Sequence, residues 1–88
     1  MNKPLLVIHE KDNVGVVLAS AAKGDTCAHQ GATIEITEPI EFAHKVALVD
    51  IGKAENVVKY GENIGYALTD IQAGQWVHVH NMGCKRGK

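Results

Sequence analysis

Apolar and polar residues alternate in several short stretches of the chain, and this alternation is its strongest structural signal. Thr33-Ile34-Glu35-Ile36-Thr37 alternates over its whole length, which predicts a strand with Ile34 and Ile36 facing the core. Other short strands are predicted at Leu5 to His9, Val14 to Leu18, Val46 to Leu48, Val57 to Lys59 and Val77 to His80. Glycines fall between these apolar runs at intervals of about 10 residues, a spacing typical of an all-β domain. The predicted fold class is therefore all-β.

A second signal is a pattern that repeats after 20 residues. Ala47-Leu48-Val49-Asp50-Ile51 recurs as Ala67-Leu68-Thr69-Asp70-Ile71, and a small residue follows each copy, Ala54 in the first and Gly74 in the second. A fainter copy spans 18–24. We interpret each unit as a strand ending in Asp-Ile, a tight turn at the small residue and a return strand. Imperfect copies in a short chain favour a folded β-domain built by internal duplication.

Asp50 and Asp70 both stand just before a predicted turn. A carboxylate at such a position can accept hydrogen bonds from backbone N–H groups. We therefore expect a structural role for both aspartates in preference to a catalytic one.

The stretch Val77-His78-Val79-His80-Asn81 carries the candidate chemistry. On an alternating strand, His78 and His80 share one face while the valines share the other. Two imidazoles so placed lie roughly 6 to 7 Å apart, close enough to hold one metal ion or one anion. Histidines on the wet side of a strand can equally be ordinary surface residues, and the pair alone leaves both interpretations open.

Length and composition indicate one small domain over residues 1–88. Apolar residues make up 45% of the chain, yet the aromatic residues are limited to Phe42, Tyr60, Tyr66 and Trp76, so the core must be largely aliphatic. Two cysteines, Cys27 and Cys84, are too few for a disulfide framework or an iron–sulfur cluster, and free thiols are expected.

The charge balance excludes two classes of partner. Nine basic and ten acidic residues give a formal charge of -1, which does not fit a binder of nucleic acid or of membrane surfaces. A basic tail at 83–88 is most simply a solvated terminus, although it could steer an acidic ligand or dock on a partner. The apolar run Leu5-Leu6-Val7-Ile8 is too short for a signal peptide or a membrane span, so a cytoplasmic protein is expected.

Several motifs follow one another in a distinctive order. They are Ala43-His44-Lys45-Val46-Ala47-Leu48, Asp50-Ile51, Lys59-Tyr60-Gly61, Ile64-Gly65, Asp70-Ile71, Gly74 and Val77-His78-Val79-His80-Asn81. Together, over about residues 5–82, they resemble the small SAF-type domain of the altronate and galactarate dehydratase family. The family usually shows Pro-x-Gly-His-Lys where this chain has Glu41-Phe42-Ala43-His44-Lys45.

The resemblance implies a β-clip fold and, for the whole enzyme, dehydration of a sugar acid. It implies a metal-dependent core, with iron as the expected metal, in a much larger domain or subunit, and no cofactor bound by this chain alone. The chain is thus expected to be a small subunit that is inactive alone and completes a substrate site with a large catalytic subunit. The alternatives are the small subunit of sulfolactate sulfo-lyase and a non-catalytic module that binds carbohydrate or protein. A homo-oligomer is also possible, because edge strands need cover.

The expected substrate-binding residues combine these motifs with the strand argument. They are His44, His78, His80, Lys59, Tyr60 and Asn81. His44 is preferred to Lys45 because adjacent residues on a strand point to opposite faces. The 20-residue offset places Tyr60 at the position of His80 in an equivalent return strand, and related units are expected to pack side by side. A metal site made of the three histidines is a weaker alternative. His9 and His29 lie outside every motif and are expected at the surface.

Overall fold

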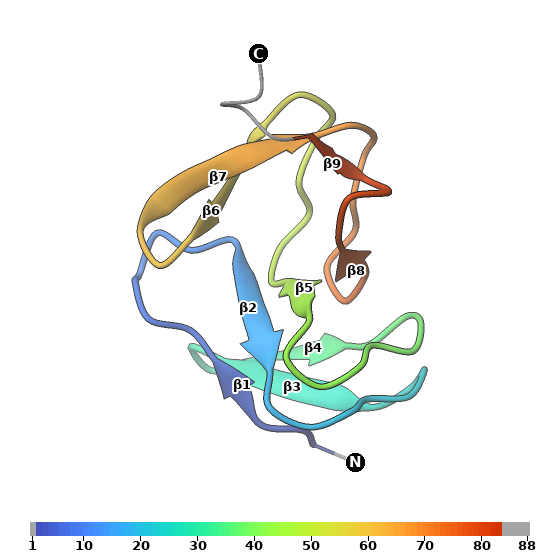
Figure 1. Ribbon diagram of the computed structural model, residues 1–88. Helices are drawn as coiled ribbons and strands as arrows, with labels where there is room; N and C mark the ends of the chain where they lie inside the picture. Colours follow the sequence, from blue (N-terminus) through green and yellow to red (C-terminus); the bar gives the residue numbers. More distant parts are fainter. Residues whose placement is uncertain (1, 84–88) are drawn as a thin grey trace.

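Residues 2–83 are described by the computed structural model, and they form short strands without any helix (Figure 1). The strands are β1 (Leu5–Leu6), β2 (Val14–Val17), β3 (Thr26–His29), β4 (Ala32–Glu35), β5 (Lys45–Ala47), β6 (Asn56–Lys59), β7 (Glu62–Ala67), β8 (Trp76–Val77) and β9 (Met82–Gly83). The all-β prediction is confirmed. Since this part of the chain has no helix, it also has none that could cross a membrane. Cys84 and the predicted basic tail from residue 84 onward lie outside the described residues.

Three layers of strands build the molecule. A four-stranded antiparallel sheet, in the order β1-β2-β5-β8, lies between the β3–β4 hairpin and a three-stranded sheet in the order β6-β7-β9 (Figure 1). The central sheet therefore has apolar partners on both faces, which explains why every residue of β2 is buried. This arrangement accounts for the continuous apolar run that the sequence shows between 14 and 17.

Each face of the central sheet has its own core. Val46 and Trp76, which pair across β5 and β8, pack on the side of Cys27 and the β3–β4 hairpin. Ala47 and Val77 point the other way and pack with residues of β6 and β7. Ile34 and Ile36 are buried at 6% and 0% exposure, as the alternation of residues 33–37 predicts. The alternation along β5 and β8 thus decides which side chains face which core.

Six β-turns between the strands of residues 2–83 share one backbone hydrogen bond, although only four of them have a residue with positive φ at the third position. In each, the N–H of the fourth residue donates to the carbonyl of the first, and the turns span 9–12, 22–25, 41–44, 52–55, 72–75 and 78–81. In five of them the side chain of the fourth residue also accepts a bond from the N–H of the first; these residues are Asp12, Asp25, Glu55, Gln75 and Asn81. Turn 41–44 differs, because its fourth residue is His44 and the ring is bonded elsewhere.

The repeat units correspond to four of these turns. Gly24, Ala54 and Gly74 all have positive φ at the third position, as expected for a tight turn at the small residue. Ala43, with φ of 73°, marks a fourth copy that the sequence analysis missed. The prediction that each unit begins with a strand ending in Asp-Ile was wrong, since β5 and β7 end at residues 47 and 67.

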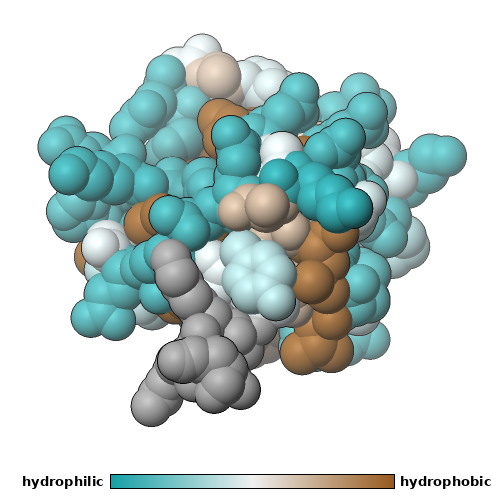
Figure 2. Space-filling model, turned by 90° about the horizontal axis from the view of Figure 1, so that it is seen from above, coloured by the Kyte–Doolittle hydropathy of each residue, from teal (hydrophilic) through white to brown (hydrophobic). Residues whose placement is uncertain are grey.

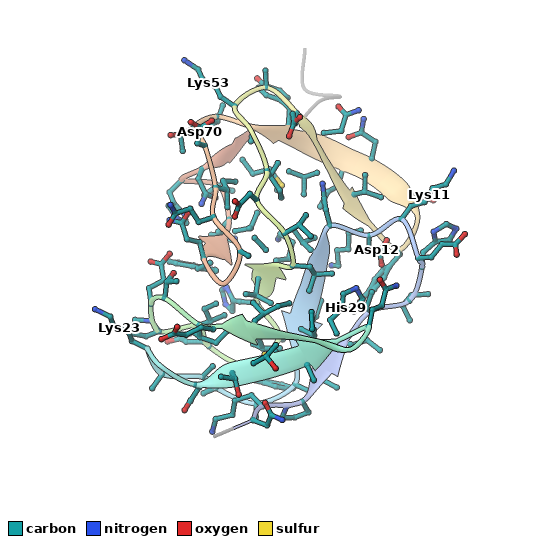
Figure 3. All side chains as sticks on the ribbon, turned by 180° about the vertical axis from the view of Figure 1, so that it is seen from behind. Lys11, Asp12, Lys23, His29, Lys53 and Asp70 are labelled. Carbon is teal, nitrogen blue, oxygen red and sulfur yellow. The ribbon has the colours of Figure 1, made fainter. Side chains whose placement is uncertain are left out.

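The Asp-Ile segments pair with each other instead of extending their own strands. Ile51 and Ile71 form an isolated antiparallel bridge. Asp50 accepts a bond from the backbone N–H of Ala73 at 2.9 Å, and Asp70 accepts one from that of Lys53 at the same distance, so each copy holds the turn of the other. Figure 3 shows Asp70 beside Lys53 at one end of the molecule. The structural role predicted for both aspartates is confirmed.

Three strands were not predicted: β3, β9 and, apart from Ala67, β7. β3 has the sequence Thr-Cys-Ala-His, which lacks a clear apolar alternation, and its pairing with β4 follows from the two-residue turn at Gln30 and Gly31. Both turn residues have positive φ, 52° and 80°, which is the geometry of a tight hairpin. Because glutamine rarely adopts this conformation, the turn was not evident from the residue types.

Candidate functional site

A cluster of aromatic and basic side chains forms where β5 begins and β8 ends. Lys45 pairs with Val77 in the antiparallel ladder, so His44, the residue before β5, comes opposite His78, the residue after β8. The ring centroids of His44 and His78 are 5.5 Å apart. The backbone of His44 is held in place because its carbonyl accepts a 3.0 Å bond from the N–H of Val17. Two residues that are 34 positions apart in the sequence thus become neighbours.

Trp76 lies at the centre of this cluster. The indole Nε1 donates a hydrogen bond of 3.1 Å to Nδ1 of His44. The indole ring stacks on His78, with centroids 5.4 Å apart and planes inclined by 11°, and it contacts His80 with centroids 4.8 Å apart. We call Trp76, His44, His78 and His80 the Trp76 cluster. The three predicted histidines are therefore brought together, and the residue that does so was missed from the sequence.

The bond from Trp76 defines the hydrogen-bonding pattern of His44. It uses the lone pair of Nδ1, so a neutral His44 ring carries its proton on Nε2, where it can donate to a ligand. His44 also occupies the turn position whose side chain closes the turn in the five related turns. Because its ring bonds to Trp76 instead, the local turn does not account for a histidine at this position.

The predicted strand through His80 was wrong. β8 ends at Val77, residues 78–81 form a turn, and Val79 is 72% exposed rather than part of the core. The physical reason is the side chain of Asn81, whose Oδ1 accepts from the N–H of His78 and whose Nδ2 donates to the carbonyl of Trp76. The turn, rather than strand alternation, places both histidines against the indole.

Asn81 has a structural part in the site. Its side chain is buried at 4% exposure, and both ends of its amide are bonded to the backbone of 76–78. Its backbone carbonyl accepts a bond from Leu68, which joins the turn to the segment after β7. Asn81 thus shapes the histidine turn, while a direct contact with substrate stays a prediction.

Lys45 is a further basic group near the cluster. It is half-buried, and this burial, followed by the charge of Lys59, lowers its pKa below the ordinary lysine value. Within residues 2–83, neither of these two lysines is neutralised by an ion pair. Lys45 does lie on the sheet face opposite His44, as predicted, since it pairs with the core residue Val77. Lys45 nevertheless belongs with the site, because its positive charge contributes to the lowered pKa of His78. The prediction that only one face of the strand carries site residues was too narrow.

The pKa of His78 is affected by its neighbours in the site. Its pKa lies below the ordinary value of 6.5, because burial penalises the charged ring and because the positive charges of Lys45 and of the two neighbouring histidines add to that effect. A neutral His78 can accept or donate a hydrogen bond at near-neutral pH. The site therefore combines cationic lysines with imidazoles that can exchange a proton.

Lys59 and Tyr60 are placed differently from the expectation. β6 and β8 belong to separate sheets, so the return strands of the two repeat units do not pack side by side. Tyr60 stands in the turn between β6 and β7, with φ of 57°, and Lys59 Nζ lies 4.8 Å from the centroid of its ring. The charge of Lys59 contributes to the lowered pKa of Lys45, which is its connection to the site. A role for Tyr60 in binding stays a prediction.

A metal site made of the three histidines finds no support in the geometry. Among the described residues, no three side chains of histidine, cysteine, aspartate or glutamate are arranged to hold a metal ion. One ring nitrogen of His44 is also bonded to the indole of Trp76. The donors of the cluster are imidazole and ammonium groups, which suit a carboxylate and hydroxyl groups.

A separate hollow of about 420 Å³ lies between the segment after β1 and the β3–β4 turn. It is lined by Leu5, Val7, Ile8, His9, Glu10, Ala28, His29 and Gln30. His29 is visible beside this region in Figure 3, and His9 accepts a bond from the backbone of Lys11. Because the lining has a carboxylate and no lysine, the hollow suits an anionic ligand less well than the Trp76 cluster does.

Two residues were missed from the sequence, and each left a signal. Trp76 directly precedes the histidine motif, and it would have been recognised from the antiparallel pairing of residues 44–47 with 75–78. Lys45 belongs to the His-Lys motif, but strand alternation places it on the face opposite His44, and we therefore left it out of the site. This argument did not consider that a lysine side chain is long, so its charge can act on groups beyond its own face.

Comparison with known proteins connects this geometry to a group of lyases. The family model described as the altronate/galactarate dehydratase SAF domain matches residues 3–85. The altronate dehydratase of Escherichia coli (strain K12) is 49% identical over 74 residues, which are 84% of this chain and 15% of that relative. The altronate dehydratase of Bacillus subtilis (strain 168) is 40% identical over 79 residues, which are 90% of this chain and 16% of the relative.

A third relative has a different length. The (2R)-sulfolactate sulfo-lyase subunit alpha of Chromohalobacter salexigens is 34% identical over 88 residues, with 91% of this chain and 94% of the relative covered. The chain thus spans about one sixth of the two dehydratases, or 15% and 16%, and nearly all of the sulfo-lyase subunit.

Proposed function

The chain belongs to the altronate/galactarate dehydratase SAF domain family, and from this membership we propose that it forms part of the substrate site of a hydroxy-acid lyase. In this proposal, the chain is the small subunit of a sugar-acid dehydratase, and a larger catalytic chain carries out the elimination. The Trp76 cluster, with Lys45, binds the carboxylate and hydroxyl groups of the acid.

The observation that carries the proposal is the convergence of three histidines on one tryptophan, near a lysine that has no ion pair within residues 2–83. His44 and His78 come from different strands and meet only in the folded sheet. The Nε2 of His44 is free to donate, because Trp76 bonds to its Nδ1. Lys45 supplies a positive charge that no carboxylate within residues 2–83 neutralises. A substrate carboxylate would supply the missing counter-charge.

The division of work follows from the chemistry of elimination. Loss of water from a hydroxy acid needs a base for the proton beside the carboxylate, stabilisation of the enediolate and an acid for the leaving hydroxyl. A divalent metal, expected as iron, would stabilise the enediolate, and the described residues offer no three-residue set to bind it. We therefore assign that step to the larger chain. The imidazoles and Lys45 orient the substrate and can move a proton at its hydroxyl oxygen.

A second candidate is the sulfo-lyase reaction, in which sulfite leaves in place of water. The extent of the match favours this candidate, because it covers 94% of a sulfolactate sulfo-lyase subunit. Sequence identity favours the dehydratase, because it is 49% to altronate dehydratase and 34% to the sulfo-lyase subunit. Both reactions require recognition of a hydroxy acid by its carboxylate, so the Trp76 cluster would serve either. A module that binds carbohydrate or protein without taking part in catalysis is the remaining alternative.

The test is co-expression with the large dehydratase-like chain of the same genome, followed by a screen of altronate, galactarate and sulfolactate. Replacement of His80 by Ala should lower turnover by the assembled enzyme by about 10² to 10⁴ while the fold and the assembly are kept, because His80 is exposed. His29→Ala, at the separate hollow, is the matched control and should leave turnover unchanged. Activity of His80→Ala within about threefold of normal would contradict the proposal.

A further inference from the structure

The second position of the six related turns distinguishes two of them from the other four. At this position the turns carry Glu10, Lys23, Phe42, Lys53, Ala73 and Val79. Four turns thus have a charged or small residue at their tip, which is what an exposed turn requires. The other two, 41–44 and 78–81, carry a large apolar side chain at the same place.

These two turns are also the ones that hold the Trp76 cluster between them. Turn 41–44 ends in His44, and turn 78–81 contains His78, whose ring centroid is 5.5 Å from that of His44. Phe42 is 61% exposed and Val79 is 72% exposed. Figure 2, which looks onto the molecule from above the view of Figure 1, shows a mainly hydrophilic face with apolar residues along one side. The apolar tips therefore border the basic site and are not scattered over the six turns.

We propose that Phe42 and Val79 are the apolar anchors of a docking surface that surrounds the Trp76 cluster and receives the larger catalytic chain. This inference rests on the proposed function and adds the surface through which the two chains meet. The occupant is a protein surface with apolar pockets for the two tips, between which it holds the hydroxy acid against the Trp76 cluster. We name it as the larger chain because the match covers only 15% and 16% of the two dehydratases, so most of each relative lies outside this domain and is available to cover the surface.

The physical consequence of such docking is a dry site. Large apolar side chains around a polar centre exclude water from it, and hydrogen bonds to a bound carboxylate become stronger in its absence. The same contact would cover Trp76, which is only partly buried in the isolated chain. The two anchors therefore act on assembly, and the histidines act on the substrate, so the two functions can be separated by substitution.

The experiment uses Phe42→Lys and Val79→Thr in the full chain, alone and together. Lysine already stands at this turn position in Lys23 and Lys53, so Phe42→Lys should fold, and Phe42→Ala is a second variant without added charge. Val49→Thr is the matched control, because Val49 is an exposed valine, at 52%, beyond the opposite end of β5. The affinity for the large dehydratase-like chain is measured by titration calorimetry, and turnover is measured with that chain in excess.

We expect the double variant to raise the dissociation constant at least about tenfold, with turnover at saturating catalytic chain within about threefold of normal. His80→Ala should do the opposite and lower turnover without loss of affinity. Unchanged affinity of the Phe42 and Val79 variants, or a change no larger than that of Val49→Thr, would overturn the docking surface and leave the proposed function standing. A dimer of the isolated chain that dissociates on Phe42→Lys would assign the surface to a second copy and overturn the inference.

Discussion

Trp76 determines the arrangement of the site at the scale of single residues. Its indole contacts His44, His78 and His80, so each imidazole has a fixed neighbour that restricts its rotamers. The bond from Nε1 to His44 also selects which ring nitrogen faces a ligand. Because it is the single tryptophan of the chain, its fluorescence reports on the cluster without interference.

The low pKa of His78 gives a prediction for titration. The midpoint of His78, followed by the ring signals in nuclear magnetic resonance, should lie below the ordinary 6.5. Lys45→Gln removes one of the positive charges that oppose protonation, so the midpoint should move upward. Lys53→Gln, on an exposed turn whose backbone is bonded to Asp70, is the control and should leave the midpoint in place. An unchanged midpoint in Lys45→Gln would show that the charge of Lys45 does not help to lower the pKa of His78.

The same shift predicts how stability depends on pH. The unfolded chain protonates His78 near 6.5, whereas the folded chain protonates it only at lower pH, so acid favours unfolding between these two values. The contribution of His78 is fully present above about pH 6.5 and is lost as the pH falls through the window below it. His78→Gln should make urea unfolding less dependent on pH in that window. Equal pH dependence of both proteins would contradict the lowered pKa.

At the scale of elements, the turn before His44 contains a residue under conformational strain. Ala43 has φ of 73°, a left-handed conformation that is unfavourable for alanine and accessible to glycine. Ala43→Gly should therefore stabilise the protein by about 0.5 to 1 kcal/mol in denaturant unfolding. Ala73→Gly is the control at a position whose φ is not positive, and it should reduce stability. A loss of stability in both variants would contradict the argument.

The two aspartates give a second prediction for the turns. Asp50→Ala and Asp70→Ala should each lower the free energy of unfolding by about 1 kcal/mol, because each removes the acceptor for one backbone N–H of the opposite repeat unit. Both carboxylates are exposed, which keeps the loss small. Chemical denaturation measures this effect, and turnover by the assembled enzyme should not change. A fall in turnover at normal stability would mean that the aspartates take part in catalysis.

Local pattern predicted most of the elements, and non-local pairing produced the rest. The alternation at 33–37 and the small residues at 24, 54 and 74 act within a few positions, so the strand and the turns followed from the sequence. β8 ends at Val77 because the side-chain amide of Asn81 forms hydrogen bonds with the backbone of Trp76 and His78. These bonds produce a turn where the alternation of residues 77–80 suggests a longer strand. Likewise, the pairing of Ile51 with Ile71 needs two repeat units in contact, which no single window of the sequence contains.

For the molecule as a whole, the site depends on the complete central sheet. His44 and His78 lie in line with Val46 and Trp76, the pair that faces the core beneath the β3–β4 hairpin. The cluster is therefore the exposed border of that core, and the residues that hold it are spread from 17 to 81. The histidines could be selected as candidates from their motif, but their contacts with Trp76 follow from the antiparallel register of β5 and β8.

The isolated 88-residue chain should bind a hydroxy acid weakly and should not turn it over. Binding depends on Lys45, Lys59 and the imidazoles, so the affinity for galactarate should fall as salt rises from about 0.01 to 0.15 M, since screening lengths shorten from about 30 to 8 Å. Turnover needs the metal-assisted step that we assign to the larger chain. Calorimetric titration with galactarate and an assay for the keto product measure these two properties. Dehydration by the purified chain alone would contradict the assignment of that step, and binding that is independent of salt would contradict an electrostatic role for the cluster.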